Sequence, residues 1–262
     1  MRRGDLGRAA MWGYIGLVLL FLYLPLVPPL TFSVGAADSG AALTWHWYAT
    51  LLESPALVVA LENSTLIALT VGVVTPPLAI LAAMAVRELR LPRLVMMVVL
   101  LPLFVPAVSM GLATAFLFRE TGIPSSFWTI ALVQVMWALP FAFLIVLTAM
   151  AGFDPLYLEA AYVHGANRLR AFVDIEVPLI WPGVSGAAIF SMILSFNETV
   201  RTALVQGPLN TVQTYIWSTY LQVGLSPTLY ALMSLLILAT LALVGAMLAL
   251  GNYRAGKRGG GA

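Results

Sequence analysis

The sequence is poor in charge and contains no cysteine. Only 9% of its 262 residues are charged, whereas 61% are hydrophobic; a soluble protein has about 25% and about 45–50% of these two classes. So few charged side chains cannot cover a water-facing surface of this size, which argues against a soluble globular protein and indicates lipid as the solvent. The absence of cysteine excludes disulfides, thiol catalysis and cysteine-ligated metals. The net charge of +2 gives no indication of a nucleic-acid partner.

Intervals without charge mark the segments that can cross a membrane. A transmembrane helix needs about 20 apolar residues, and a charge at mid-bilayer costs roughly 2.5–3.5 kcal/mol. The long interval after Arg201 is broken by glycine, proline and polar residues, so only its second half qualifies. The sequence therefore predicts an all-α integral membrane protein with one domain over residues 1–262. Its six spans are expected at about 10–34, 63–86, 94–118, 127–151, 178–197 and 228–250.

Basic residues test this count independently, because short cytoplasmic loops concentrate lysine and arginine. With six spans, only Arg119 and Arg201 fall on one side of the membrane. The other side receives Arg2, Arg3, Arg8, Arg87, Arg90, Arg93, Arg168, Arg170, Arg254, Lys257 and Arg258. This alternation predicts that both termini are cytoplasmic. A signal peptide ending near residues 35–37 is disfavoured, because the first apolar run is longer than the usual core of about 7–15 residues.

A helix is expected at the start of the segment 152–177, the one sizeable loop on the basic side. Asp154 can accept hydrogen bonds from free amides at a helix start, and Pro155 suits the first helical position. Gly165 tolerates the left-handed backbone that commonly ends a helix. The sequence therefore predicts a helix from Pro155 to about residue 164.

A second helix is expected in the same segment. Asn167 can cap its start, and Pro178 is expected to close it after about Glu176. The resulting helix-turn-helix carries apolar residues such as Leu156 and Val163 although it lies outside the predicted spans. Such a surface is typical of a docking element. An amphipathic segment lying on lipid headgroups is the alternative, and periodicity does not decide between them.

The segment 152–177 resembles the EAA loop of permeases from binding-protein-dependent ABC importers. The family pattern E-A-A-x3-G-x9-I-x-L-P is matched except that Val177 replaces leucine. The matching residues are Glu159, Ala160, Ala161, Gly165, Ile175 and Pro178. The resemblance implies a type I importer permease-like bundle in the bacterial inner membrane, with these residues coupling it to a separate ATPase.

A second resemblance lies near the end of the chain. The stretches 194–198, 207–208 and 223–227 are similar to the second permease subunit of spermidine/putrescine-type transporters. This implies that the chain forms half of a pore for a small solute, a polyamine or similar. The implied partners are a different permease chain, an ATPase dimer that holds ATP and Mg, and an extracytoplasmic solute-binding protein.

Asn197 and Glu198 are the candidate residues of the substrate path. They stand where this subfamily typically has two acidic residues. A carboxylate at the outer end of the fifth span could attract an amine substrate. Alternatively, Glu198 forms an ion pair with Arg201 one turn further on, and the spacing favours this second interpretation.

The sequence gives no indication of an enzyme. It assembles no Ser/His/Asp group, and His46 and His164 are too far apart to suggest a metal site. Residues 251–257 spell G-x4-G-K, but Arg258 follows where a phosphate-binding loop has serine or threonine, so ATP and Mg are expected on a partner and no cofactor on this chain. A secondary transporter driven by an ion gradient is an alternative, although no span centre carries the expected charge. An integral-membrane enzyme is a third.

Overall fold

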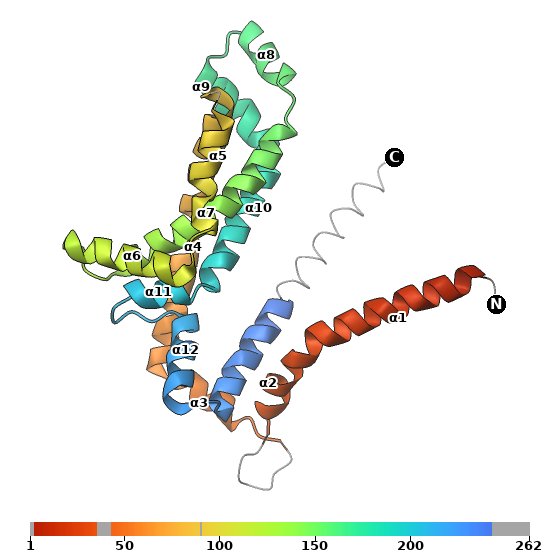
Figure 1. Ribbon diagram of the computed structural model, residues 1–262, viewed down its shortest axis with the longest axis vertical. Helices are drawn as coiled ribbons and strands as arrows, with labels where there is room; N and C mark the ends of the chain where they lie inside the picture. Colours follow the sequence, from red (N-terminus) through yellow and green to blue (C-terminus); the bar gives the residue numbers. More distant parts are fainter. Residues whose placement is uncertain (1–2, 36–42, 90, 243–262) are drawn as a thin grey trace. The chain divides into compact units, whose positions relative to one another are not determined.

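The computed structural model describes residues 3–35, 43–89 and 91–242, and the regular structure of these residues is helical (Figure 1). They form two compact units. One is Ala56–Ser218, and the other comprises the described residues before Ala56 and after Ser218. Residues 36–37, the end of the sixth expected span and the G-x4-G-K pattern lie outside the described residues.

The unit Ala56–Ser218 contains the segments that the sequence singled out. Its helices pack around α4, α7 and α10, which lie side by side in Figure 1. In chain order the elements are α4 (Pro55–Glu88), α5 (Pro92–Leu100), η2 (Leu101–Leu103), α6 (Ala107–Glu120), α7 (Phe127–Ala151), α8 (Leu156–Val163), α9 (Arg168–Ala171), the π-helix η3 (Phe172–Glu176), α10 (Val177–Phe196), α11 (Val200–Val205) and α12 (Val212–Val223), whose last turns pass into the other unit.

Four described helices are long and apolar enough to cross a membrane. They are Met11–Phe32, Pro55–Glu88, Phe127–Ala151 and Arg168–Phe196. They cover the first, second, fourth and fifth expected spans, and the fourth matches the expected bounds. Of the sixth expected span, the structure describes the helix Pro227–Ala242.

The third expected span, about 94–118, is a pair of helices with a sharp bend between them. Its two halves, Pro92–Leu103 and Ala107–Glu120, meet at an angle of 96°. Pro106 stands directly before α6 with φ −54° and ψ 140°, an extended conformation that interrupts the helix. Proline also has no amide hydrogen to continue the helical ladder. Counted as one broken span, the pair raises the number of candidate spans from four to five.

Two short helices occupy the stretch that the sequence excluded as a membrane span. α11 and α12 follow α10, where glycine, proline and glutamine interrupt the apolar run. At the start of α12 the Thr211 amide donates to Thr214 Oγ1 over 2.9 Å, and the two hydroxyls lie 3.2 Å apart. This reciprocal capping stabilises a helix start. The Thr-x-x-Thr spacing was the available sequence signal.

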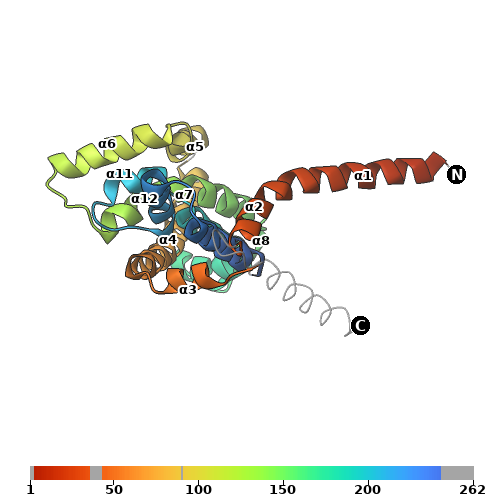
Figure 2. The same cartoon turned by 90° about the horizontal axis from the view of Figure 1, so that it is seen from below.

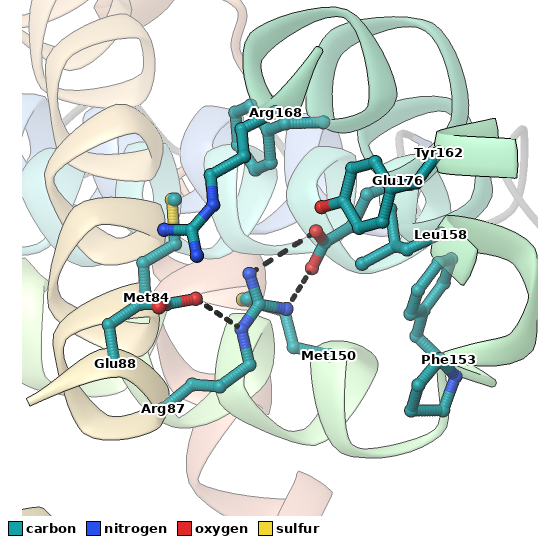
Figure 3. Close-up of a pocket in the computed structure, with 11 residues that line it drawn as sticks. Met84, Arg87, Glu88, Met150, Phe153, Leu158, Tyr162, Arg168 and Glu176 are labelled. Carbon is teal, nitrogen blue, oxygen red and sulfur yellow. Dashed lines mark hydrogen bonds and ion pairs between the residues drawn. The ribbon is translucent and has the colours of Figure 1, made fainter. Parts of the chain in front are cut away.

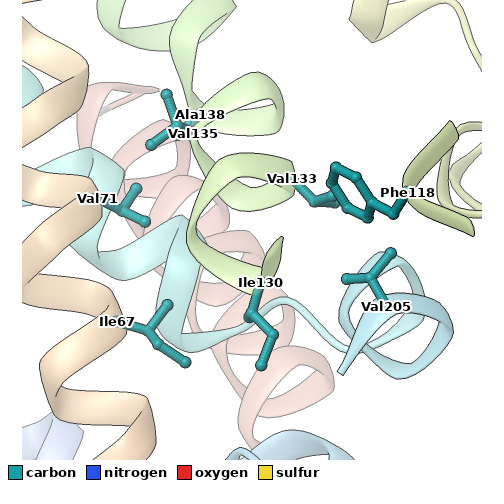
Figure 4. Packing of buried hydrophobic residues seen from close by; sticks show 8 residues of the cluster. All are labelled: Ile67, Val71, Phe118, Ile130, Val133, Val135, Ala138 and Val205. Atoms are coloured by element: carbon teal, nitrogen blue, oxygen red, sulfur yellow. The ribbon is translucent and has the colours of Figure 1, made fainter. Parts of the chain in front are cut away.

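The core of this unit is built from small and branched apolar side chains. Figure 4 shows one cluster, in which Ile67 and Val71 of α4 face Ile130 of α7. A second cluster joins the same helices through alanines, including Ala79 of α4 and Ala187 of α10. Small side chains let helix axes approach closely, which increases van der Waals contact where no hydrophobic effect drives association.

Glycines mark the closest helix contacts. A Cβ at Gly183 of α10 would collide with Ala149 Cβ of α7. A Cβ at Gly111 of α6 would lie 2.6 Å from Leu204 Cδ1 of α11. Figure 2 shows α6 lying beside α11. Both contacts therefore depend on the missing side chain.

The other unit is held together around Tyr48. It contains α1 (Arg3–Tyr23), η1 (Leu24–Leu26), α2 (Val27–Phe32), α3 (His46–Leu52) and the helix Pro227–Ala242. The Tyr48 hydroxyl lies 2.8 Å from Ser33 Oγ and 2.7 Å from Ser234 Oγ. This single hydroxyl joins α3 to the residue after α2 and to the helix Pro227–Ala242.

We expect Gly183→Ala to lower the apparent melting temperature of the detergent-solubilised protein. The new methyl group meets a Cβ that is fixed to the α7 backbone, and overpacking of this kind costs about 1–3 kcal/mol. Gly186→Ala is the matched control, because its Cβ would find Ile145 Cγ2 only at 4.0 Å. Equal melting temperatures for the two variants would contradict the close α7–α10 contact.

Candidate functional site

The first helix of the segment 152–177 begins and ends as its sequence predicts. The Leu156 amide donates to Asp154 Oδ1 over 3.0 Å. At the other end Gly165 adopts φ +83°, and the Gly165 and Ala166 amides donate to the carbonyls of Tyr162 and Ala161, each over 3.0 Å. This pair of bonds is a Schellman motif, which satisfies the last carbonyls of the helix. Gly165 thus turns the chain without strain.

The second helix begins as predicted but does not end at Pro178. Asn167 Oδ1 accepts from the Arg170 amide over 2.8 Å. The helix then continues through the π-helix Phe172–Glu176 into α10, with Pro178 in its first turn. The Val177 amide just before it bonds back to Phe172 O, five residues earlier, which is the π-helical pattern. The expected helix end at this proline is therefore wrong, and α9 runs on into α10 as one helix.

The residues of the EAA pattern are largely accessible. The exposed residues of the pattern are Glu159, Ala160, Gly165 and Pro178. Ile175 is half-buried, and Ala161 in the last turn of α8 is buried. Large apolar side chains beside them are exposed as well, with Val163 at 85%. The others are Leu156, Tyr157, Tyr162, Leu169 and Val173. This short segment thus exposes six large apolar side chains.

A cavity of about 480 Å³ lies between α8 and the ends of α4 and α7 (Figure 3). At its wall, Arg87 of α4 donates two hydrogen bonds to Glu176 of the π-helix, Nη1 to Oε1 at 2.6 Å and Nη2 to Oε2 at 3.3 Å. Sequence reasoning placed neither residue in a functional site. Glu176 occupies the variable position of the I-x-L-P pattern, and the available signal was an acidic residue flanked by Ile175 and Val177.

The second predicted site, Asn197 and Glu198, lies after the other end of α10. Glu198 is buried and paired with Arg201, whose Nη1 lies 2.8 Å from Glu198 Oε2 and whose amide donates to Oε1 over 2.9 Å. The ion pair that the spacing favoured is therefore present. Asn197 is exposed and donates to the Ile193 carbonyl over 2.8 Å.

Residues of α7, which sequence reasoning did not include, complete this polar cluster. The Arg201 guanidinium lies 3.9 Å from the centre of the Trp137 ring, a cation–π contact. One turn away, Gln134 donates to Thr202 Oγ1 over 2.9 Å and accepts from Ser195 Oγ. The cluster thus joins α7, the end of α10 and α11 through buried polar contacts. Because α10 separates them, the cluster and the segment 152–177 are two distinct sites.

The chain belongs to the family of binding-protein-dependent transport system inner membrane components, whose sequence model matches residues 76–252. It is thus the permease component of an ABC importer, and not its ATPase. It is a multi-pass protein of the inner membrane that works with a solute-binding protein.

Curated relatives cover most of the chain at low identity. The spermidine/putrescine transport system permease protein PotC of Escherichia coli K12 is 26% identical over 244 residues, which are 91% of this chain and 92% of that protein. The protein of the same name from Haemophilus influenzae is 26% identical over 236 residues, 88% of this chain and 92% of that one. The putrescine permease PotI of E. coli K12 is 26% identical over 248 residues, 89% and 88% of the two chains.

Solved structures show the same fold. A chain from a bacterial ABC transporter that imports the acidic polysaccharide alginate matches with a TM-score of 0.73 at 14% identity, covering 97% of this chain and 98% of that one. A chain from an alginate transporter in complex with its periplasmic protein, bound to an alginate pentasaccharide, matches with a TM-score of 0.70 at 20% identity, covering 95% and 93%.

We expect Arg201→Gln to destabilise the protein by about 3–5 kcal/mol, because it strips a buried carboxylate of its counter-charge. The double variant Glu198→Gln/Arg201→Gln should recover most of this loss, since no buried charge remains. Thermal melting in detergent measures both, and Arg119→Gln, which changes an exposed arginine, is the control. Losses that simply add in the double variant would contradict the pairing.

Proposed function

We propose that this chain forms half of the translocation pore of an ATP-driven importer and docks on a separate ATPase subunit through the segment 152–177. The observation that carries the proposal is the exposed apolar surface of α8 and α9 around Glu159, Ala160 and Gly165. A surface of this kind belongs against another protein. Because α9 continues into α10, the docked partner would be connected directly to a membrane-spanning helix.

The same proposal fixes the orientation. The segment 152–177 and both termini face the cytoplasm, where the basic residues gather. The two compact units serve together as one permease domain over residues 1–262. The partners are a second permease subunit that differs in sequence from this chain, and an ATPase dimer that holds ATP and Mg. Similarity to the spermidine/putrescine permease PotC supports a different second chain.

Motion would pass from the ATPase to the pore mechanically. Closure of the ATPase pair displaces α8, and the Gly165 turn, tied by its two hydrogen bonds, carries the displacement to α9. From α9 the helix runs on to Phe196. Because α10 packs closely on α7 at Gly183, both helices move as one body between two discrete states.

The proposed solute is a polyamine or a similar small molecule. The support is the function of the similar proteins, which are spermidine/putrescine and putrescine permeases. Asn197 and Glu198 remain the proposed substrate-path residues, and Asn197 is exposed whereas Glu198 is buried. Because Arg201 neutralises Glu198, an amine would have to compete with this arginine for the carboxylate.

We expect Gly165→Leu to prevent co-purification of the ATPase subunit with the permease. A Cβ at Gly165 meets nothing within 4 Å in this chain, so the intrinsic cost is the left-handed backbone penalty of about 1–2 kcal/mol. Gly122→Leu is the matched control, because Gly122 also has positive φ and open space around its Cβ. If the ATPase subunit stays bound to Gly165→Leu, this docking surface is the wrong one.

We expect uptake of labelled spermidine or putrescine by proteoliposomes that contain the assembled importer. Uptake should require ATP inside the vesicles together with the solute-binding protein outside. A complex that couples ATP hydrolysis to neither polyamine would overturn the proposed solute class while leaving the importer function intact. Uptake by this chain alone on an ion gradient would overturn the ATP-driven mechanism.

A further inference from the structure

The Arg87–Glu176 ion pair joins two elements that are far apart in sequence. Arg87 ends α4, and Glu176 is the last residue of the π-helix before α10. Arg87 Nη1 donates to Glu176 Oε1 and Arg87 Nη2 donates to Glu176 Oε2, as Figure 3 shows. Such a bidentate arrangement fixes direction as well as distance. The pair therefore ties the end of one candidate span to the start of another.

The burial of the two side chains is unequal. Glu176 is 1% exposed, whereas the Arg87 side chain is 39% exposed. A buried carboxylate needs a charged partner, because taking a charge out of water is expensive. Glu176 is thus held to Arg87, whose side chain reaches in from solvent. A displacement of the π-helix would pull on Arg87 and with it on α4.

The local helix geometry and packing favour transmission through this pair. Glu176 closes a π-helix, a rare form that occurs frequently at functional sites. The neighbouring cavity of about 480 Å³ separates α8 residues such as Leu158 and Tyr162 from Met84 of α4. Arg87 and Glu176 line the same cavity, so their ion pair bridges α4 and the π-helix at its wall. The ion pair is a direct link between the segment 152–177 and α4.

We infer that Arg87 and Glu176 are positioning residues that pass the movement of the segment 152–177 to α4 as well as to α10. This inference rests on the proposed docking of that segment on an ATPase. It adds a second route of transmission, because α10 follows the segment through the continuous chain and α4 follows it through the ion pair. Two of the central helices would then respond to one displacement.

The test compares three variants in the complete importer, purified with its partner subunits and reconstituted in liposomes. Glu176→Gln removes the charge that joins the two elements. Glu88→Gln is the matched control. Glu88 contacts the same arginine at 3.3 Å, but both residues belong to α4, so this contact does not link α4 to another element. Arg87→Lys keeps a charge pair. The readouts are ATP hydrolysis stimulated by the binding protein and solute uptake, both per assembled complex.

We expect Glu176→Gln to lower uptake per ATP hydrolysed by about three- to thirtyfold. Glu88→Gln should leave this ratio unchanged, and Arg87→Lys should retain most of it. A merely structural role would instead lower the amount of assembled complex without changing the ratio. An unchanged ratio in Glu176→Gln overturns the inference.

If Glu176→Gln does not assemble, the double variant Arg87→Gln/Glu176→Gln decides. It leaves no unpaired buried charge, so assembly should recover while the charged link stays absent, and the ratio should remain low. A normal ratio in the double variant overturns the inference. Failure of the ATPase docking itself is recognised separately, because it appears as loss of co-purification in Gly165→Leu.

Discussion

The need to satisfy every backbone polar group without water governs this structure. In hydrocarbon an unpaired amide or carbonyl costs several kcal/mol, so a spanning segment must bond within itself. The described regular structure is accordingly helical. The hydroxyls of threonines such as Thr65 and Thr70 donate to the carbonyl four residues earlier, each over 2.8 Å. Prolines are placed under the same rule. Pro76 and Pro140 are buried within continuous helices, whereas Pro106 marks the bend before α6.

Charge is handled by a related constraint at the two ends of α10. A buried carboxylate stands just before this helix and another just after it, and each is neutralised by an arginine. Glu176 pairs with Arg87 of α4, and Glu198 pairs with Arg201 of α11. Polar groups that cannot be left unpaired thereby become connections between elements. α10 is tied at its start to α4 and at its end to α11 and, through Trp137, to α7.

These connections join the segment 152–177 to the central helices of its unit. α9 continues into α10, so the segment 152–177 has no flexible joint after Asn167. Within the bundle, alanines and glycines bring α4, α7 and α10 close enough that one helix cannot shift without the others. The structure therefore combines an accessible apolar surface with a tightly packed central group of helices.

Much of this follows from the sequence alone. Low charge and long apolar runs determined a helical membrane protein. The bounds expected for the fourth span, about 127–151, which carries no charge, agree with α7. Short-range signals also sufficed at Asp154, Gly165 and Asn167, since capping depends on neighbours within a few residues. The pairing of Glu198 with Arg201 could be predicted for the same reason, because the two residues are three positions apart.

Only the tertiary structure decided the rest. Pro106 stands at a bend of 96°, whereas Pro178 lies within a continuous helix, directly after a π-helix. The partnership of Arg87 with Glu176 spans 89 positions, and that of Gln134 with Thr202 spans 68. No periodicity or spacing specifies contacts at such separations, because they arise when whole helices pack. The sequence determined which residues are helical and apolar, and packing determined which of the few polar groups meet.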